Sequence, residues 1–202
     1  MASPPGYIGV GVLGAATAWW HGLLLRHPRV RGPVGRRREL GFFTEFCLRE
    51  MTEADVAAYH ARFRAGPGEV AGEWTPGYLH EPWTPVLLRR AAPDARLLVL
   101  LRDPVEQYRD RIAEARRALG EEEAYQFVVD AIGRLRHATQ LRALRDAVGP
   151  ERILVLQQEQ CVRDPAGEYR RTLRFLGVAD DVVPDRVHAP PRPPRSLRAA
   201  LA

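Results

Sequence analysis

The chain lacks lysine entirely, although it is basic. Its 30 lysine-plus-arginine positions are all arginine, against 25 aspartates and glutamates, which gives a formal net charge of +5. The absence of lysine excludes a nucleoside-triphosphatase phosphate loop, because that motif needs a Gly-Lys-Ser/Thr step. Arginine keeps its charge when buried and binds phosphate or sulfate through two parallel hydrogen bonds, so an anionic ligand fits the composition. A general preference for arginine codons would produce the same composition, so the net charge alone does not show that the protein binds an anion.

Cysteine and metal-ligand patterns are also scarce. The two cysteines, Cys47 and Cys161, lie far apart and show no metal-ligand spacing. We expect a free, buried thiol at each position, with a disulfide as the alternative, and therefore a reducing, cytoplasmic location. The six histidines are scattered without triad or metal spacing, so we predict no metal site. Among them, His137 is placed nearest to the expected cleft.

Long apolar runs and nucleic-acid modules are missing as well. The apolar stretch at residues 7–20 has no basic leader and is interrupted by glycines and Thr17. It is too short and too rich in glycine to span a bilayer, so we predict neither a signal peptide nor membrane association. No recognisable nucleic-acid-binding module or basic-aromatic stripe occurs, so we expect no nucleic-acid partner.

Strand and helix patterns alternate along the 202 residues. After Arg96, residues 97–101 are apolar without alternation, which predicts a strand at 96–101 that is buried on both faces, as in a parallel sheet. The pattern predicts an α/β fold with a parallel central sheet flanked by helices on both faces. We expect one domain over residues 1–182 and a Pro/Arg-rich extended tail over 183–202. The other strands are expected at 7–12, 70–73 and 152–156, and helices at 17–26, 52–63, 82–91, 104–119, 122–148 and 165–176.

Three loops follow three of these strands, at residues 13–17, 74–78 and 102–104. Ligands of parallel α/β sheets bind beyond the C-terminal ends of the strands, so these loops are candidate parts of one site. The first loop has small residues between a strand and a helix, a layout in which backbone N–H groups cradle phosphate. The alternative is an ordinary tight turn in which Thr17 caps the helix.

Four segments together resemble the PAPS-dependent sulfotransferases, especially their bacterial and heparan-type branch (PAPS is 3′-phosphoadenylyl sulfate). They are residues 11–28, ending in His-Pro, residues 38–43 (Arg-Glu-Leu-Gly-Phe-Phe), residues 72–79 (Gly-Glu-Trp-Thr-Pro-Gly-Tyr-Leu) and residues 97–106, with the Arg-Asp-Pro turn. A weaker match covers 152–177, so the resemblance extends over roughly residues 6–180. It implies the P-loop-containing nucleotide-hydrolase-like fold of those enzymes.

The resemblance also implies an activity and its residues. The expected enzyme transfers a sulfuryl group from PAPS to a hydroxyl or amine of a small-molecule or sugar acceptor, without a metal. Glu39 is the expected catalytic base, with pairing to an arginine as the alternative, and Glu73 is an expected acceptor for loop N–H groups. Arg102 is the expected 3′-phosphate contact, with an ion pair to Asp103 as the alternative. Trp74 and Tyr78 are expected to line the acceptor site, with core packing as the alternative. The expected phosphosulfate cradle is the backbone of Gly14, Ala15, Ala16, Thr17 and Ala18.

Several positions depart from the family pattern. The loop cation falls at Gly14, the loop glycine at Ala16 and the second hydroxyl residue at Ala18; an arginine from residues 36–38 is a hypothesis for the missing cation. The second 3′-phosphate contact falls at Asp110, whose charge would repel phosphate. The chain also ends where the family begins its last helix, so we expect a cofactor-covering segment to be missing. The alternative function is therefore a catalytically impaired relative that acts as a binding or interaction module.

Overall fold

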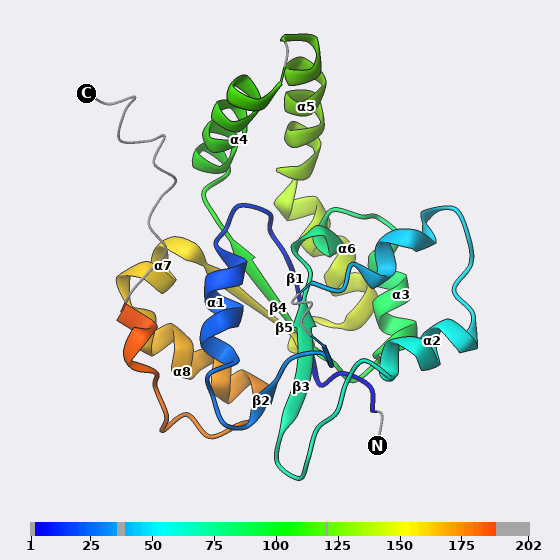
Figure 1. Cartoon of the computed structure of the whole chain (residues 1–202), viewed down its shortest axis with the longest axis vertical. Coiled ribbons are helices and arrows are strands. Elements are labelled where there is room, and N and C mark those ends of the chain that lie inside the picture. Colours follow the sequence, from blue (N-terminus) through cyan, green and yellow to red (C-terminus); the bar gives the residue numbers. More distant parts are fainter. Residues whose placement is uncertain (1–2, 36–38, 120, 189–202) are drawn as a thin grey trace.

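A five-stranded, wholly parallel sheet forms the centre of the computed structural model, which describes residues 3–35, 39–119 and 121–188. The strand order is β2-β3-β1-β4-β5, as Figure 1 shows. The predicted strands are confirmed, and β2, a strand of two residues, was not predicted. The strands are β1 (Tyr7–Gly11), β2 (Val30–Arg31), β3 (Val70–Trp74), β4 (Arg96–Leu101) and β5 (Ile153–Gln157).

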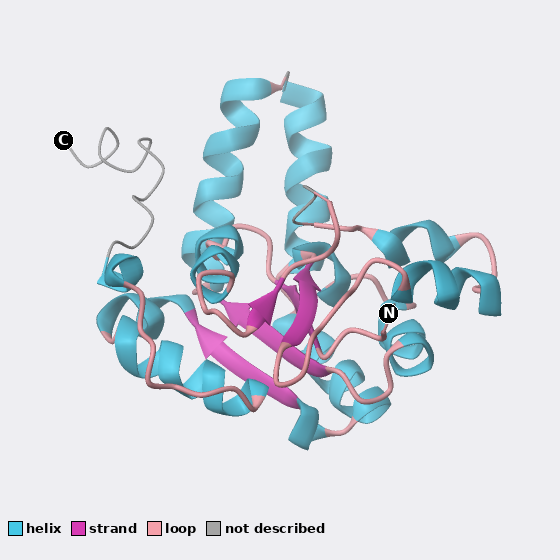
Figure 2. Ribbon diagram, turned by 60° about the horizontal axis from the view of Figure 1, so that its bottom comes forward, coloured by secondary structure: helices cyan, strands magenta, loops and turns pink. Residues whose placement is uncertain are grey.

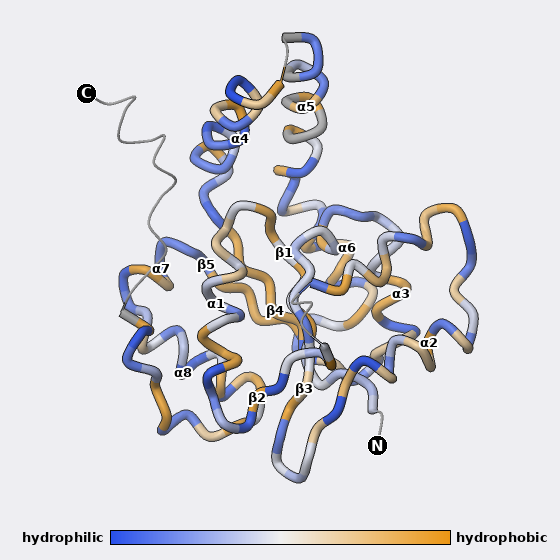
Figure 3. The backbone as a smooth tube through the Cα atoms, in the orientation of Figure 1, coloured by the Kyte–Doolittle hydropathy of each residue, from blue (hydrophilic) through white to orange (hydrophobic). Residues whose placement is uncertain are grey.

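Helices cover both faces of this sheet (Figures 1 and 2). One face carries α1 (Thr17–Leu24), α7 (Gln158–Arg163) and α8 (Pro165–Leu176). The other carries α2 (Glu53–His60), α3 (Thr84–Ala91) and α6 (His137–Val148). The predicted α/β fold is therefore confirmed, and the hydrophobic strands β1 and β4 run through its core (Figure 3).

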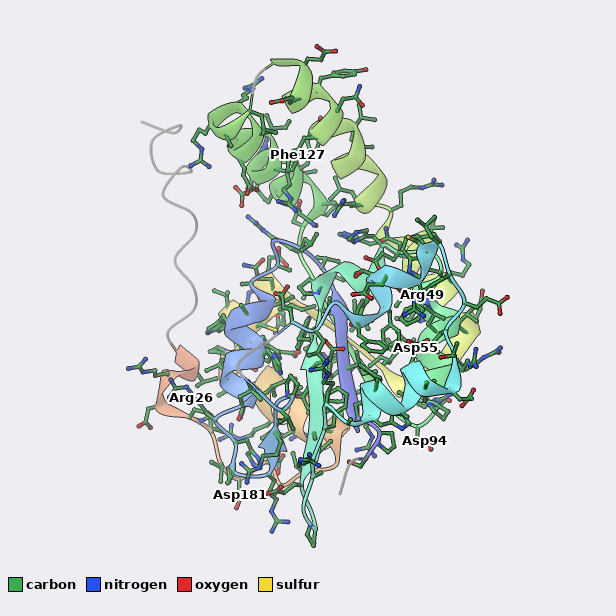
Figure 4. The ribbon with its side chains drawn as sticks, turned by 45° about the vertical axis from the view of Figure 1, so that its right-hand side comes forward. Arg26, Arg49, Asp55, Asp94, Phe127 and Asp181 are labelled. Atoms are coloured by element: carbon green, nitrogen blue, oxygen red, sulfur yellow. The ribbon has the colours of Figure 1, made fainter. Side chains whose placement is uncertain are left out.

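The remaining helices, α4 (Pro104–Ala118) and α5 (Glu121–Arg134), form a hairpin that stands out from the sheet (Figures 1 and 2). The prediction of one helix over 122–148 is wrong, because the helix is interrupted between the end of α5 and the start of α6. The two helices pack on different partners: α5 packs on α4, and α6 packs on α3. One straight helix would not reach both partners. Within the hairpin, the Arg111 guanidinium lies 5.3 Å from the ring centroid of Phe127, the residue that Figure 4 labels there.

Short polar motifs set several helix ends. Thr52 and Asp55 form a capping box at the start of α2. Arg49 donates two hydrogen bonds to Asp55, at 2.9 and 3.0 Å (Figure 4). These contacts hold the pKa of Asp55 well below its usual range. At the end of α8, Gly177 adopts the left-handed conformation that glycine commonly provides at helix C-termini.

The first residues of the predicted tail, 183–188, are not extended throughout, since Asp185–His188 forms a 3-10 helix and Val187 is fully buried. The rest of the predicted tail, 189–202, lies outside the described residues, so the predicted domain boundary stays a prediction.

Both cysteines are free, as predicted, but only Cys161 is buried, whereas Cys47 is exposed. Within the described ranges, no helix has the length and apolar character needed to cross a membrane.

The turn from β1 into α1 uses two left-handed residues. Gly14 has φ of +82° and Ala16 has φ of +58°. Ala16 occupies the N-cap position without a side-chain cap, and Thr17 is the first helical residue. The alternative in which Thr17 caps the helix is therefore wrong. A non-glycine residue in this conformation carries a steric cost, because Cβ approaches the following carbonyl oxygen.

We expect Ala16→Gly to stabilise the protein by about 0.5–1 kcal/mol, because relief of that steric cost exceeds the entropy that glycine loses on folding. The free energy of unfolding in urea measures the change. The matched control is Ala18→Gly, two residues further on and inside α1, which should lose about 1 kcal/mol. Equal losses at both positions would contradict the left-handed conformation at Ala16.

Candidate functional site

The loops after β1 and β4 meet at the point where the strand order of the sheet reverses. The chain adds β2 and β3 on one side of β1, and then β4 and β5 on its other side. Ligand sites of open parallel sheets occur at such switch points. Two hydrogen bonds tie the loops together. Gln107 Nε2 donates to the carbonyl of Leu13 at 2.7 Å, and Arg102 Nη1 donates to the carbonyl of Gly14 at 3.1 Å.

The β1–α1 loop has unused backbone donors. Its Ala15 amide donates to the carbonyl of Val12 at 3.2 Å. In the described part of the chain, no hydrogen bond engages the amides of Gly14, Ala16, Thr17 or Ala18. The last two are also the first amides of α1, where the helix dipole is positive. The loop therefore has the donors that an anion requires, in the place that the sequence predicted.

Arg102 is bound by a carboxylate. Its Nη1 lies 2.6 Å from Asp110 Oδ2, and the two side chains are only 12% and 15% exposed. The alternative partner, Asp103, instead accepts hydrogen bonds from the first turn of α4, at 2.8 Å from the Val105 amide and 3.1 Å from the next. Arg102 is thus paired with the aspartate that the sequence had marked as unfavourable for a phosphate.

Three residues at the end of β3 and in the loop after it hold the segment at residues 40–42. The amides of residues 40, 41 and 42 donate in turn to Glu73 Oε2 (3.1 Å), Thr75 Oγ1 (3.2 Å) and Tyr78 Oη (2.7 Å). We call Glu73, Thr75 and Tyr78 the amide clasp. The clasp confirms Glu73 as an acceptor for a loop N–H group.

Glu73 is the centre of the clasp and is fully buried. Besides the amide of residue 40, it accepts hydrogen bonds from Thr75 Oγ1 (2.6 Å), Tyr59 Oη (2.9 Å) and Tyr78 Oη (3.0 Å). Burial raises the pKa of Glu73, although the four hydrogen bonds act in the opposite direction. Sequence analysis missed Tyr59, because nothing in its helix distinguishes it from an ordinary core aromatic residue.

Glu39 immediately precedes the segment that the clasp holds. Glu39 is an exposed residue, but the protein around its carboxyl group partly desolvates it, and this desolvation raises its pKa. No ion pair joins it to an arginine among residues 3–35, 39–119 and 121–188. The arginines proposed to replace the missing loop cation, residues 36–38, lie outside the described residues.

Trp74 and Tyr78 lie in the core and not on an open surface. Both are almost completely buried. Trp74 Nε1 donates to the carbonyl of Gly11 at 3.2 Å, and the Tyr78 hydroxyl belongs to the clasp. The structure therefore favours the core-packing alternative for both rings, because an acceptor reaches neither without displacing their neighbours.

An open pocket lies next to the β1–α1 loop, with about 370 Å³ of space including its solvent-filled mouth. Gln107 and Gln140, two of the residues that line it, each have a buried amide oxygen with no hydrogen-bond partner among the described residues. Each Nε2 donates to a backbone carbonyl, of Leu13 and Arg134 respectively, which identifies the unpaired atom as oxygen. The pocket is lined by Val12, Leu13, Pro76, Leu79, His80, Gln107, Tyr108, Arg111, Arg134, Leu135 and Gln140.

Two further expectations concern histidine and metals. His137 does not line this pocket, and its buried Nε2 has no hydrogen-bond partner among the residues described. Burial lowers the pKa of His137. Over the described ranges, no cluster of three or more His, Cys, Asp or Glu side chains is placed to hold a metal ion.

We expect Glu73→Leu to release residues 40–42, because leucine fills a similar volume but accepts none of the four hydrogen bonds. The protein should lose about 2–4 kcal/mol of unfolding free energy, since buried donors are left unpaired. Hydrogen exchange at the amides of residues 40–42 should accelerate more than exchange in β4. The control Glu45→Leu, on an exposed side chain nearby, should change stability by less than about 0.5 kcal/mol. Unchanged exchange at residues 40–42 would show that the clasp does not hold the segment.

Comparison with known proteins agrees with this architecture. The sequence profile of a sulfotransferase family matches residues 60–182. A sulfotransferase from Alicyclobacillus acidocaldarius is 27% identical, with a TM-score of 0.71, over 98% of this chain and 90% of that one. No curated protein matches the sequence.

Two more distant structures share the fold. The sulfotransferase domain of the curacin biosynthetic pathway is 15% identical, with a TM-score of 0.61, over 94% of this chain and 79% of that one. A sulfotransferase from Mycobacterium avium is also 15% identical, with a TM-score of 0.60, over 94% and 67% of the two chains. The profile includes the amide clasp and the Arg102–Asp110 pair but begins after the β1–α1 loop and Glu39. Because the match covers more than half of the chain, the chain belongs to the sulfotransferase family.

Proposed function

We propose that the protein transfers a sulfuryl group from PAPS to a hydroxyl or amine of a small-molecule or sugar acceptor. The observation that carries the proposal is the set of unpaired amides in the β1–α1 loop of a sulfotransferase fold. When bound, PAPS supplies an electrophilic sulfur, whose bond to the phosphate oxygen breaks as the acceptor atom attacks. Such transfers depend mainly on positioning and on stabilisation of charge, and residues of this chain offer both.

On the donor side, main-chain amides would replace the loop cation that is missing at Gly14. The amides of Gly14, Ala16, Thr17 and Ala18 and the hydroxyl of Thr17 would bind the phosphosulfate. The positive end of the α1 dipole would stabilise the negative charge that develops on the leaving phosphate. Arg102 and Gln107 keep the loop in place by binding its carbonyls.

On the acceptor side, Glu39 would take the proton that the acceptor releases. The amide clasp fixes the backbone that follows Glu39, so that its carboxylate is presented from an ordered segment. Partial burial raises its pKa, which makes the carboxylate a stronger base.

The acceptor itself would occupy the pocket next to the loop. The unpaired oxygens of Gln107 and Gln140 need hydrogen-bond donors, which hydroxyl and amino groups supply. A small polar acceptor such as a sugar meets this requirement. A cytoplasmic location belongs to the same proposal and is supported by the two free cysteines.

Calorimetric titration with adenosine 3′,5′-bisphosphate, the product of PAPS, tests the proposal. We expect micromolar binding and about tenfold weaker binding by Thr17→Val, which removes one hydroxyl from the cradle. The same exchange at exposed Thr139 should leave the affinity unchanged. Absence of binding at millimolar concentration would favour the catalytically impaired alternative, for which the Arg102–Asp110 ion pair is the structural argument.

We expect Glu39→Gln to lower kcat by about 10²–10⁴-fold, because general-base catalysis is lost, while nucleotide affinity is kept. A base works only when deprotonated, so wild-type kcat/KM should fall as the pH drops through a pKa above the usual 4.5 of glutamate. Glu45→Gln removes a nearby exposed carboxylate and should preserve both the rate and the pH profile. A Glu39→Gln variant with wild-type kcat would exclude Glu39 as the base.

A further inference from the structure

Arg102, which donates a hydrogen bond to the β1–α1 loop, already has two acceptors. Arg102 Nη1 lies 2.6 Å from Asp110 Oδ2 and 3.1 Å from the Gly14 carbonyl oxygen. Asp110 follows Arg102 by eight residues and projects back to it from α4. One guanidinium therefore links the end of β4, helix α4 and the loop.

Other carboxylates lie at the same edge of the sheet. Asp103 directly follows Arg102 and caps α4. Its amide donates to Glu159 Oε1 of α7 at 2.9 Å. The positive charge of Arg102 is thus neutralised by Asp110, within a region that contains two further acidic side chains.

This arrangement affects the donor nucleotide at its 3′ end, where Arg102 is the expected contact. A phosphate that approaches Arg102 must either displace Asp110 or remain beside its carboxylate. In the first case the largely buried carboxylate loses its partner, and in the second the two negative charges repel each other. In both cases this electrostatic cost offsets the favourable free energy of binding the 3′-phosphate to Arg102.

We propose that Asp110 determines donor specificity by removing the preference for a 3′-phosphate. The donor site then binds a nucleotide through its 5′-phosphosulfate end and treats nucleotides with and without a 3′-phosphate almost equally. Arg102 is a positioning residue that holds the Gly14 carbonyl and hence the loop. The inference rests on the proposed function, because it concerns the same nucleotide site.

The test compares the dissociation constants of adenosine 3′,5′-bisphosphate and adenosine 5′-monophosphate by calorimetry. In the wild-type protein we expect the two constants to agree within about threefold. Asp110→Ser frees Arg102 and should tighten bisphosphate binding about tenfold or more, the effect of a charge-assisted hydrogen bond, while monophosphate binding stays the same. Asp110→Asn keeps an acceptor for Arg102 and should also strengthen bisphosphate binding relative to monophosphate binding. This variant replaces Asp110→Ser in the test if the serine variant does not fold.

Two variants serve as controls. Glu114→Gln removes one negative charge from an exposed position on the same helix and should leave the ratio unchanged. The double variant Arg102→Ala with Asp110→Ser should lose the gain of Asp110→Ser, because the cation responsible for it is gone.

The outcomes separate this inference from the proposed function. Two results overturn the inference and leave the proposed sulfuryl transfer unaffected. One is a wild-type protein that already prefers the bisphosphate by about tenfold or more, and the other is a ratio of the two dissociation constants that neither Asp110 variant changes. Absence of binding of both nucleotides to the wild type and to every variant overturns both.

Discussion

The buried carboxylate of Glu73 is the contact on which the candidate site depends. It receives four hydrogen bonds from three different parts of the chain: helix α2, the segment at residues 40–42 and the loop after β3. A carboxylate deep in a protein persists only when its oxygens are satisfied, so these elements are held together at one point. Through this contact, the segment that follows Glu39 is anchored at the C-terminal end of β3.

The second constraint is electrostatic. A chain without lysine has no compact cation for the β1–α1 loop, and Arg102, the arginine that reaches the loop, is neutralised by Asp110. The positive potential left in the described loop is that of the backbone: unpaired amides and the N-terminus of α1. The loop therefore suits one anionic group that comes close to the main chain, which is the arrangement that glycine and alanine side chains permit.

Most of the architecture could be predicted from local patterns. The unbroken apolar run at residues 97–101 predicted a central parallel strand, because only a strand covered on both faces tolerates such a sequence. The helix expected at residues 52–63 is α2, and the capping box of Thr52 and Asp55 at its start is a local sequence feature. The break between α5 and α6 could not be predicted, because the periodicity continues through it and the change of packing partner is a tertiary effect. The two-residue strand β2 is too short to leave a pattern.

The sequence by itself determined the α/β class and the family, because strand periodicity and motif spacing are local properties. Tertiary structure decided what the individual side chains do. It buried Trp74 and Tyr78, which the sequence had offered as acceptor contacts, and it brought Tyr59 to Glu73 and Asp110 to Arg102. A side chain's role depends on its partners and its exposure, and both are set by chain segments far away in sequence, which no local pattern encodes.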